Sequence, residues 1–403
     1  MDPSERSDDI SMEELWCLAE TAGAEPVCTL IQTKDHPDPH SFLGSGKVLE
    51  LKELAQNEGC DLVIFDNDLS PSQARVLEET LGIRVMDRTG IILDIFAQRA
   101  HTREGILQVE LAQYRYLLPR LTGMWTHLKR QAGTSAPIGT RGPGETQLET
   151  DRRHIRRRIQ KLCEELEVVR RIRGTQRKQR ERNAVPVVAL VGYTNAGKST
   201  LLNTLTGDCI QTGNRLFDTL DTTTRKLTLN EAGQVLLSDT VGFIRKLPHE
   251  LVDAFKATLE ELTYADLLLH VIDISNPDWE AQAAVVDDLI YRLGAAQTPC
   301  IRVYNKCDAF FGRLPSGEDE VCISAKTGEG TQTLLYAIGQ KLGADLSRMN
   351  LCIPYSHTNL VDVIRREANL LDLQYAEDGI RVLAVVRPDL RAKLLAFEVA
   401  QDG

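Results

Sequence analysis

The run VPVVALVGYTNAGKST at residues 185–200 constrains the fold of this chain more than any other segment. An apolar stretch leads into G-x-x-x-x-G-K-S, with Gly192, Gly197, Lys198 and Ser199, and the helical pattern TLLNTLTG follows. This strand, loop and helix predict a phosphate-binding loop, because glycines let backbone N–H groups face phosphates at a helix N-terminus. Lys198 would reach the β- and γ-phosphates, and Ser199 would offer a hydroxyl to Mg²⁺.

A second segment, VYNKCD at 303–308, selects the base. The Asp308 carboxylate can accept hydrogen bonds from the N1–H and the exocyclic amine of guanine, whereas adenine offers no such donor pair. The tripeptide Ser324–Lys326 follows the strand pattern EVCIS, and its backbone N–H groups suit the guanine oxygen. Together with Asn305 and Lys306, these residues predict guanine specificity.

Two further segments complete the pattern of a GTPase. Asp239–Gly242 (DTVG) follows the strand pattern QVLLS and matches D-x-x-G, whose acid holds the magnesium shell and whose glycine N–H contacts the γ-phosphate. Between the phosphate loop and this motif lies FDTLDTTTR, in which Thr219 is the candidate switch threonine that ligates Mg²⁺. Thr222, Thr223 and Thr224 are alternatives for that role.

The residue after Gly242 is Phe243, at a position where many small GTPases carry the glutamine that orients the attacking water. A phenyl ring cannot orient water. We therefore expect slow intrinsic hydrolysis that a partner or another group completes. The catalytic residue is unassigned, with Lys198 and Gly242 contributing phosphate contacts.

Outside this region, the first hundred residues alternate helical patterns (12–23 and 47–59) with an extended segment (25–32) and an apolar strand pattern (61–67). Such alternation predicts a small parallel α/β sheet. Ser70, Pro71 and Gln73 supply an N-cap, a first-turn proline and a capping-box partner for a helix that follows. The GSGK turn at 44–47 lacks an upstream glycine and is interpreted as a tight turn that opens a helix.

From 104 to 131 the pattern is helical, and glycines and prolines between 134 and 145 then predict a loop. Residues 151–182 are dense in arginine and lysine, and apolar residues spaced by three and four predict an amphipathic helix with a basic outer face. The apolar positions are Leu162, Leu166, Val169 and Ile172. A solvated helix packed on its predecessor and an RNA-binding arm are both open interpretations.

With 403 residues, of which 42% are hydrophobic, two or three domains are expected. The net charge of -11 disfavours a general nucleic-acid coat protein, although a local basic segment can override that sign. There is no long apolar run or basic leader, and nine scattered cysteines without a C-x-x-C pair are typical of reduced thiols, so we expect a cytoplasmic protein, as a monomer. The eight histidines show no metal-ligand spacing.

The predicted fold class is α/β, with a doubly wound, mostly parallel P-loop domain at 184–345. It is preceded by an α/β domain at 1–103 and a helical arm at 104–183. A small α/β extension at 346–403 shows a strand, helix, strand, strand, helix pattern.

These motifs, with RGPGETQLETDRR at 141–153 and the helical segment 93–121, closely resemble the HflX family of ribosome-associated GTPases. The resemblance covers residues 10–345 and implies magnesium ligands at Ser199 and Thr219. It implies nucleotide contacts at Gly192, Tyr193, Thr194, Asn195, Ala196, Gly197, Lys198, Ser199, Phe217, Asp218, Thr219, Leu220, Asp221, Asp239, Thr240, Val241, Gly242, Asn305, Lys306, Cys307, Asp308, Ser324, Ala325 and Lys326.

The resemblance also implies binding to the large ribosomal subunit, which stimulates hydrolysis, and a role in splitting or rescuing stalled ribosomes under stress. The arginines at 152, 153, 156, 157 and 158 suit rRNA phosphates. Some members of the family bind ATP in the N-terminal domain. Two alternatives stay open at this point: a factor whose GTP-bound form alone acts on the ribosome, and a GTPase that assists RNA processing or ribosome assembly.

Overall fold

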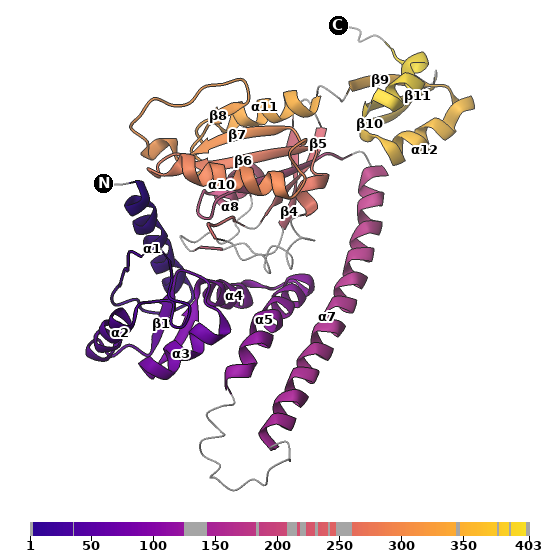
Figure 1. Cartoon of the computed structure of the whole chain (residues 1–403). Helices are drawn as coiled ribbons and strands as arrows, with labels where there is room; N and C mark the ends of the chain where they lie inside the picture. The colour runs from indigo at the N-terminus through magenta and orange to yellow at the C-terminus, as the bar shows by residue number, and fades with distance from the viewer. Residues whose placement is uncertain are drawn as a thin grey trace. The chain divides into compact units, whose positions relative to one another are not determined.

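The computed structural model describes residues 3–34, 36–124, 143–182, 185–207, 216–217, 223–229, 233–240, 242–246, 260–343, 347–376, 379–386 and 388–399 (Figure 1). Contacts between residues divide the chain into two compact units. Unit 1 comprises residues 1–167 and 246–255, and unit 2 comprises 168–245 and 256–403. The four-part division predicted from the sequence stays a prediction.

Unit 1 contains a small α/β core followed by longer helices. Strands β1 and β2 pair in parallel, with Leu62 opposite Arg84, as the alternating pattern predicted. The extended segment 25–32 joins no strand ladder in the described chain. The elements in chain order are α1 (Pro3–Thr21), α2 (Ser45–Asn57), β1 (Leu62–Phe65), α3 (Pro71–Leu81), β2 (Arg84–Asp87), α4 (Arg88–Arg99) and α5 (Arg103–Met124).

Two local predictions in unit 1 are confirmed. Ser70 caps α3 by accepting from the Gln73 N–H at 3.2 Å, and the Gln73 side chain accepts from the Ser70 N–H at 3.0 Å. The GSGK turn opens α2, with Gly44 as its N-cap in extended backbone. The Gly44 N–H is donated to Gln32 Oε1 at 3.1 Å, so the Gln32 side chain holds the start of this turn in place.

Helix α7 (Pro143–Arg182) is the basic helix that the sequence predicts. Leu162 and Leu166 are fully buried, but Ile172 is 55% exposed, so the prediction of an apolar stripe that continues through Ile172 is wrong. Arg158 makes a two-point ion pair with Glu110 of α5, at 2.9 and 2.7 Å. This pair fixes α7 against α5 and removes Arg158 from the set of arginines expected to meet phosphates.

Unit 2 contains a six-stranded sheet in the order β4-β5-β3-β6-β7-β8. Only β4 runs antiparallel to its neighbour, and the other pairings are parallel, which confirms the predicted doubly wound α/β class. The strands are β3 (Val187–Gly192), β4 (Thr223–Leu229), β5 (Gly233–Asp239), β6 (Leu267–Asp273), β7 (Cys300–Asn305) and β8 (Glu320–Cys322). The helices are α8 (Lys198–Thr206), α10 (Trp279–Arg292) and α11 (Thr331–Gly343).

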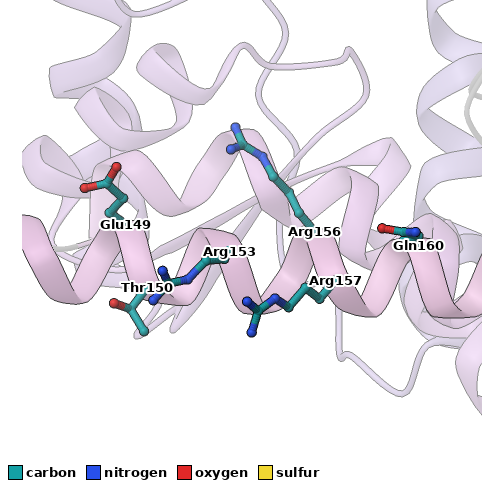
Figure 2. A pocket seen from close by; sticks show the side chains of 6 residues that line it. All are labelled: Glu149, Thr150, Arg153, Arg156, Arg157 and Gln160. Atoms are coloured by element: carbon teal, nitrogen blue, oxygen red, sulfur yellow. The ribbon is translucent and has the colours of Figure 1, made fainter.

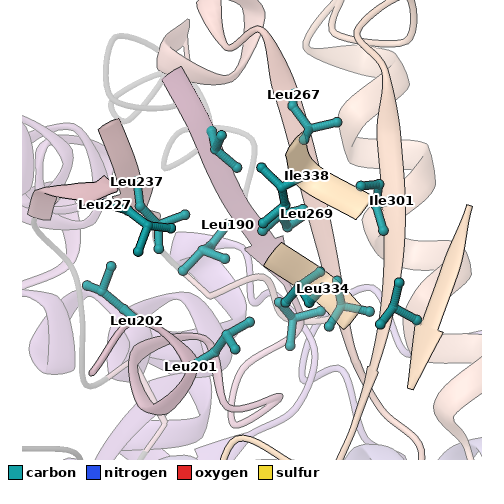
Figure 3. Close-up of a cluster of buried hydrophobic side chains, with 14 of the residues drawn as sticks. Leu190, Leu201, Leu202, Leu227, Leu237, Leu267, Leu269, Ile301, Leu334 and Ile338 are labelled. Atoms are coloured by element: carbon teal, nitrogen blue, oxygen red, sulfur yellow. The ribbon is translucent and has the colours of Figure 1, made fainter. Parts of the chain in front are cut away.

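Alternation along β6 assigns its side chains to two apolar layers. Leu267 and Leu269 face a core that they share with Leu201 of α8 and Leu334 of α11, as Figure 3 shows. Ile272 faces the opposite layer, with Ala283 of α10 and Tyr304. Helices therefore cover both faces of the sheet and leave the carboxyl ends of its parallel strands for loops.

The C-terminal part of unit 2 is a three-stranded antiparallel sheet with helices, as its pattern predicted. It comprises β9 (Ser347–Ile353), α12 (Thr358–Glu367), β10 (Asn369–Ala376), β11 (Gly379–Val386) and α13 (Pro388–Leu394), with its own buried core. Across the described ranges of the chain, none of the helices combines the length and apolar character that a membrane span requires.

Candidate nucleotide site

The loop between β3 and α8 is shaped by two residues with left-handed backbone. Asn195 has φ +59° and Gly197 has φ +92°. A Cβ at Gly197 would lie 2.2 Å from Asn305 Nδ2, and one at Gly192 would lie 2.3 Å from the carbonyl oxygen of Val271. Glycine is therefore required at both positions, because the loop curls tightly and presses its backbone against β6 and β7.

Lys198 begins α8 and is buried inside this loop. Its ammonium donates to the carbonyl oxygens of Gly192 at 3.0 Å and Tyr193 at 2.8 Å. Burial lowers the pKa of Lys198 to about 8, and the nearby Asp239 carboxylate opposes that effect. The loop thus holds a cation at the start of a helix, where the helix dipole also favours an anion.

Ser199 and Asp239 place two oxygen ligands side by side. Ser199 Oγ donates to Asp239 Oδ2 at 2.8 Å, and Asp239 is fully buried at the end of β5. Hydroxyl and carboxylate oxygens are the ligands that Mg²⁺ prefers, and this ion usually takes few protein ligands beside water and phosphate. The two residues therefore fit a magnesium ion that accompanies a bound phosphate chain.

The D-x-x-G segment is built into the phosphate loop. Thr240 Oγ1 donates to the carbonyl oxygen of Leu190 at 2.6 Å, and Phe243 forms an isolated parallel bridge with Tyr193. The backbone bonds of that bridge are Thr194 N to Phe243 O at 2.8 Å and Phe243 N to Gly192 O at 3.1 Å. Phe243 is 2% exposed, so its ring serves packing at the position where a water-orienting glutamine would stand.

Gly242 and Thr194 lie against each other beside the lysine. A Cβ at Gly242 would be 3.0 Å from Thr194 Cγ2 and 3.2 Å from Lys198 Nζ. The hydroxyl of Thr194 is buried and makes no hydrogen bond within the described parts of the chain. A buried hydroxyl of this kind calls for a partner, and a phosphate oxygen would supply an acceptor.

Asn305 connects the phosphate loop to the loop that follows β8. Its Nδ2 donates to the carbonyl oxygen of Ala196 at 2.8 Å, and its Oδ1 accepts from the Ala325 N–H at 2.9 Å. The backbone N–H of Ala325, one of the groups predicted to meet the guanine oxygen, is thus engaged with Asn305. Asn305 is therefore a positioning residue for both loops.

The remaining residues of the base loops lie where parallel strands end. Lys306 has φ +64°, and its ammonium donates to Asp273 Oδ2 at 2.6 Å. Asp308 and Lys326 are exposed, whereas Ser324 is buried and caps the turn by accepting from the Thr327 N–H at 3.2 Å. An exposed carboxylate beside a fixed backbone suits recognition of a base edge.

Two contributors escaped the sequence prediction. Asp273 could have been found, because it directly ends the apolar strand β6 at the same sheet edge. Thr204 Oγ1 donates to the carbonyl oxygen of Ala325 at 2.7 Å and so supports the base loop from α8, which no pattern signals. Residues 218–221, which include Thr219, and Val241 lie outside the described residues, whereas Phe217 is described and buried.

A separate basic hollow lies along α7 (Figure 2). It has a volume of about 430 Å³ and is lined by Glu149, Thr150, Arg153, Arg156, Arg157 and Gln160. Figure 2 shows Arg153 and Arg157 projecting from the same side of the helix as Thr150. All three lining arginines are exposed, whereas Arg152 is half-buried, so the basic face is narrower than the run of five arginines suggested.

Comparison with known proteins finds three family models along the chain. These are GTP-binding GTPase N-terminal at residues 9–97, GTP-binding GTPase Middle Region at 99–180, and 50S ribosome-binding GTPase at 187–306. The GTPase HflX of Caldanaerobacter subterraneus subsp. tengcongensis is 47% identical over 398 residues, covering 98% of this chain and 92% of that protein.

Two further relatives carry the same description. The GTPase HflX of Lacrimispora saccharolytica is 48% identical over 388 residues, covering 95% of this chain and 91% of that protein. The GTPase HflX of Escherichia coli (strain K12) is 45% identical over 350 residues, covering 85% and 82%. The similarity thus extends well beyond the nucleotide motifs.

Proposed function

The chain belongs to the HflX family of GTPases and hydrolyses GTP, and on that premise we propose that it uses GTP to dock on the large ribosomal subunit and hydrolysis to leave it. The family model over 187–306, described as a 50S ribosome-binding GTPase, supports the choice of subunit. The observation that carries the proposal is the buried Phe243, which leaves hydrolysis dependent on a partner. We further propose that this action splits or rescues stalled ribosomes in the cytosol under stress.

In the proposed site, the phosphates of GTP lie in the Gly192–Ser199 loop. Lys198 would exchange its two carbonyl acceptors for the β- and γ-phosphate oxygens, and Thr194 would donate its hydroxyl to the same group. Because Gly242 has no side chain, its backbone can approach the γ-phosphate. Because only GTP carries a γ-phosphate, these contacts at the end of β5 would distinguish GTP from GDP.

Ser199 and the proposed switch residue Thr219 would hold Mg²⁺, with Asp239 in its outer shell. When bound, this ion neutralises charge on the β- and γ-phosphate oxygens. The hydrogen bond that Ser199 Oγ donates to Asp239 Oδ2 at 2.8 Å supports a shared role for Ser199 and Asp239 at this ion. Removal of magnesium with a chelator should weaken GTP binding to wild type, and Ser199→Ala should reduce that dependence.

Guanine recognition is proposed for the loops that follow β7 and β8. Asp308 would accept two hydrogen bonds from the base, while Asn305 keeps its backbone bonds to both loops. Exchange of Asp308 for Asn removes one acceptor and supplies a donor in its place. The expected result is a loss of guanine preference with intact folding, measured by competition between GDP and xanthosine diphosphate.

Hydrolysis needs a group that orients water, and Phe243 is not one. With its ring 2% exposed and its backbone bonded to Gly192 and Thr194, Phe243 cannot leave without breaking the loop. We propose that contact with the large subunit rearranges the site or supplies the missing group. The test is GTP turnover of the purified protein with and without isolated large subunits.

The basic hollow on α7 is the proposed contact with rRNA. Arg153, Arg156 and Arg157 are exposed there, and one face of a helix can follow a phosphate backbone. Each lost phosphate contact should reduce the slope of log affinity against log salt by about 0.7 to 0.9. Arg153→Glu with Arg157→Glu should therefore weaken subunit binding and flatten its salt dependence.

A control matched in charge is Arg170→Glu with Arg171→Glu, which changes two exposed arginines on the same helix outside the hollow. Equal losses in the hollow variant and the control would indicate a net-charge effect and contradict the proposed contact. A selective loss would support it. Binding is measured by co-sedimentation with large subunits at three salt concentrations.

Two other functions are distinguished by direct assays. If the GTP-bound form alone acts on the ribosome, a variant that binds but does not hydrolyse GTP should split ribosomes once without release. If the chain assists RNA processing or assembly, it should favour immature over mature large subunits. The proposal does not extend to ATP in unit 1, because the Gly44 N–H in the GSGK turn is already donated to Gln32.

A further inference from the structure

Two cysteines lie close together at the loops that are proposed to bind guanine. Cys307 lies between Lys306 and Asp308, and Cys322 ends β8, two residues before Ser324. The two thiols lie close enough to act on each other's pKa. Both pack against the apolar cluster that contains Ile272.

The backbone explains why these two cysteines meet. Tyr304 stands opposite Cys322 in the parallel ladder of β7 and β8. The chain then folds back, so that Cys307 N donates to the carbonyl oxygen of Ile323 at 3.2 Å and Cys307 Sγ donates to that of Tyr304 at 3.2 Å. Cys322 Sγ donates to the carbonyl oxygen of Pro315 at 3.3 Å. The pair is therefore held by the fold of both loops.

We propose that Cys307 and Cys322 form a reversible disulfide that uncouples the guanine loops and weakens nucleotide binding. This inference rests on the proposed role of Asp308 and of the Ser324–Lys326 loop in binding the base. In the reaction, both S–H bonds break and one S–S bond forms. Two electrons and two protons pass to a peroxide, which is reduced to two waters, and a dithiol reverses the step.

The direction of the effect follows from geometry. A disulfide needs sulfur atoms about 2.05 Å apart, closer than two thiols that are not bonded to each other can lie. Closing that gap pulls Cys307 and the adjoining Asp308 toward β8. Asn305 holds the neighbouring loops at 2.8 and 2.9 Å, so a shift of this size misaligns the carboxylate with the base.

Accessibility makes the reaction depend on the bound state. Both cysteines are only partly exposed, and burial raises the pKa of Cys307 to about 11 and raises that of Cys322. Few thiolates are present near neutral pH, so oxidation is slow while the loops are closed. Nucleotide bound at these loops would cover the pair further, so oxidation should be faster in the nucleotide-free chain.

A second thiol pair in unit 1 supplies an internal control. Cys28 is exposed and lies close enough to the half-buried Cys60 for that thiol to raise its pKa, and both are far along the chain from any nucleotide motif. Peroxide should oxidise this pair at least as readily, without any effect on nucleotide affinity. Comparison of Cys322→Ser with Cys60→Ser therefore separates a local effect from general oxidation.

The experiment uses the full chain, oxidised with hydrogen peroxide after GDP is removed. Peptide mass spectrometry identifies the Cys307–Cys322 disulfide, and titration with fluorescent GDP measures affinity before oxidation, after it, and after dithiothreitol. The expected result is at least tenfold weaker binding that dithiothreitol restores. Cys322→Ser should abolish the effect, whereas Cys60→Ser should retain it.

The reduction potential of the cysteine pair gives a second measurement, because GDP binding and disulfide formation are thermodynamically linked. A purely structural role of the cysteines would not make this potential depend on GDP. If the disulfide form binds GDP tenfold less tightly, saturating GDP must raise the reduction potential of the pair by about 30 mV. Absence of the Cys307–Cys322 peptide, or equal GDP affinity of the reduced and cross-linked forms, would overturn the inference. Failure of the reduced chain to bind GDP at these loops would instead overturn the proposed function.

Discussion

Replacement of Asn305 by alanine tests how the phosphate and base loops are held together. Asn305 is 2% exposed and bonds to Ala196 O and to Ala325 N. Alanine leaves that carbonyl and that N–H buried without their partner. At about 1 to 3 kcal/mol for each unsatisfied group, the total cost is roughly 2 to 6 kcal/mol.

This cost divides between folding and nucleotide binding, since bound nucleotide needs both loops in place. A factor of ten in affinity corresponds to about 1.4 kcal/mol, so GDP should bind at least ten times less tightly. The unfolding temperature should fall by several degrees, at about 2 to 4 °C per kcal/mol for a unit of this size. Fluorescent GDP titration and thermal unfolding measure the two parts.

Two variants sharpen the test. Asn305→Asp keeps an acceptor for the Ala325 N–H but sets a second acceptor against the Ala196 carbonyl, so it should bind no better than the alanine variant. Asn350→Ala makes the same truncation at an exposed position of β9 and should behave as wild type. If Asn305→Ala bound GDP within twofold of wild type and unfolded at an unchanged temperature, Asn305 would not be the residue that holds the two loops together.

Three further changes have defined outcomes. Lys198 has a pKa lowered to about 8, and phosphate favours its protonated form, so GDP affinity should hold below pH 8 and fall about tenfold from pH 7 to 9 relative to Lys198→Arg. GDP binding at pH 8 should therefore take up protons, which calorimetry in two buffers measures. Absence of proton uptake at pH 8 would contradict a lowered pKa of Lys198. Gly242→Ala brings a Cβ to 3.0 Å from Thr194 and 3.2 Å from the lysine, so subunit-stimulated GTP turnover should drop at least tenfold while GDP affinity changes less than threefold. Leu201→Ala empties a fully buried site between α8 and the sheet and should cost about 2 to 5 kcal/mol in urea unfolding, and a cost below 1 kcal/mol would contradict the packing described.

Local chemistry explains which predictions from sequence are confirmed. The Ser70 capping box and the strand, loop and helix around Gly197 depend on a few adjacent residues, and their patterns are correspondingly specific. The parallel sheet follows from apolar strands separated by helices. These features are local, so tertiary contacts had little scope to change them.

Other features depend on contacts that no pattern carries. Ile172 lies three residues after Val169, yet it is exposed because spacing does not say where packing ends. Arg158 belongs to a basic run, but Glu110 on another helix engages it. The meeting of Cys307 and Cys322 requires the pairing of β7 with β8, which the separate motifs do not reveal.

Dependence of hydrolysis on the large subunit is tested most directly by GTP turnover of the purified chain at fixed salt, alone and with isolated large or small ribosomal subunits. Because Phe243 occupies the position of a water-orienting residue, we expect slow turnover alone and strong stimulation by large subunits only. Fast turnover of the isolated chain, or indifference to both subunits, would contradict this expectation and leave only the GTPase activity standing.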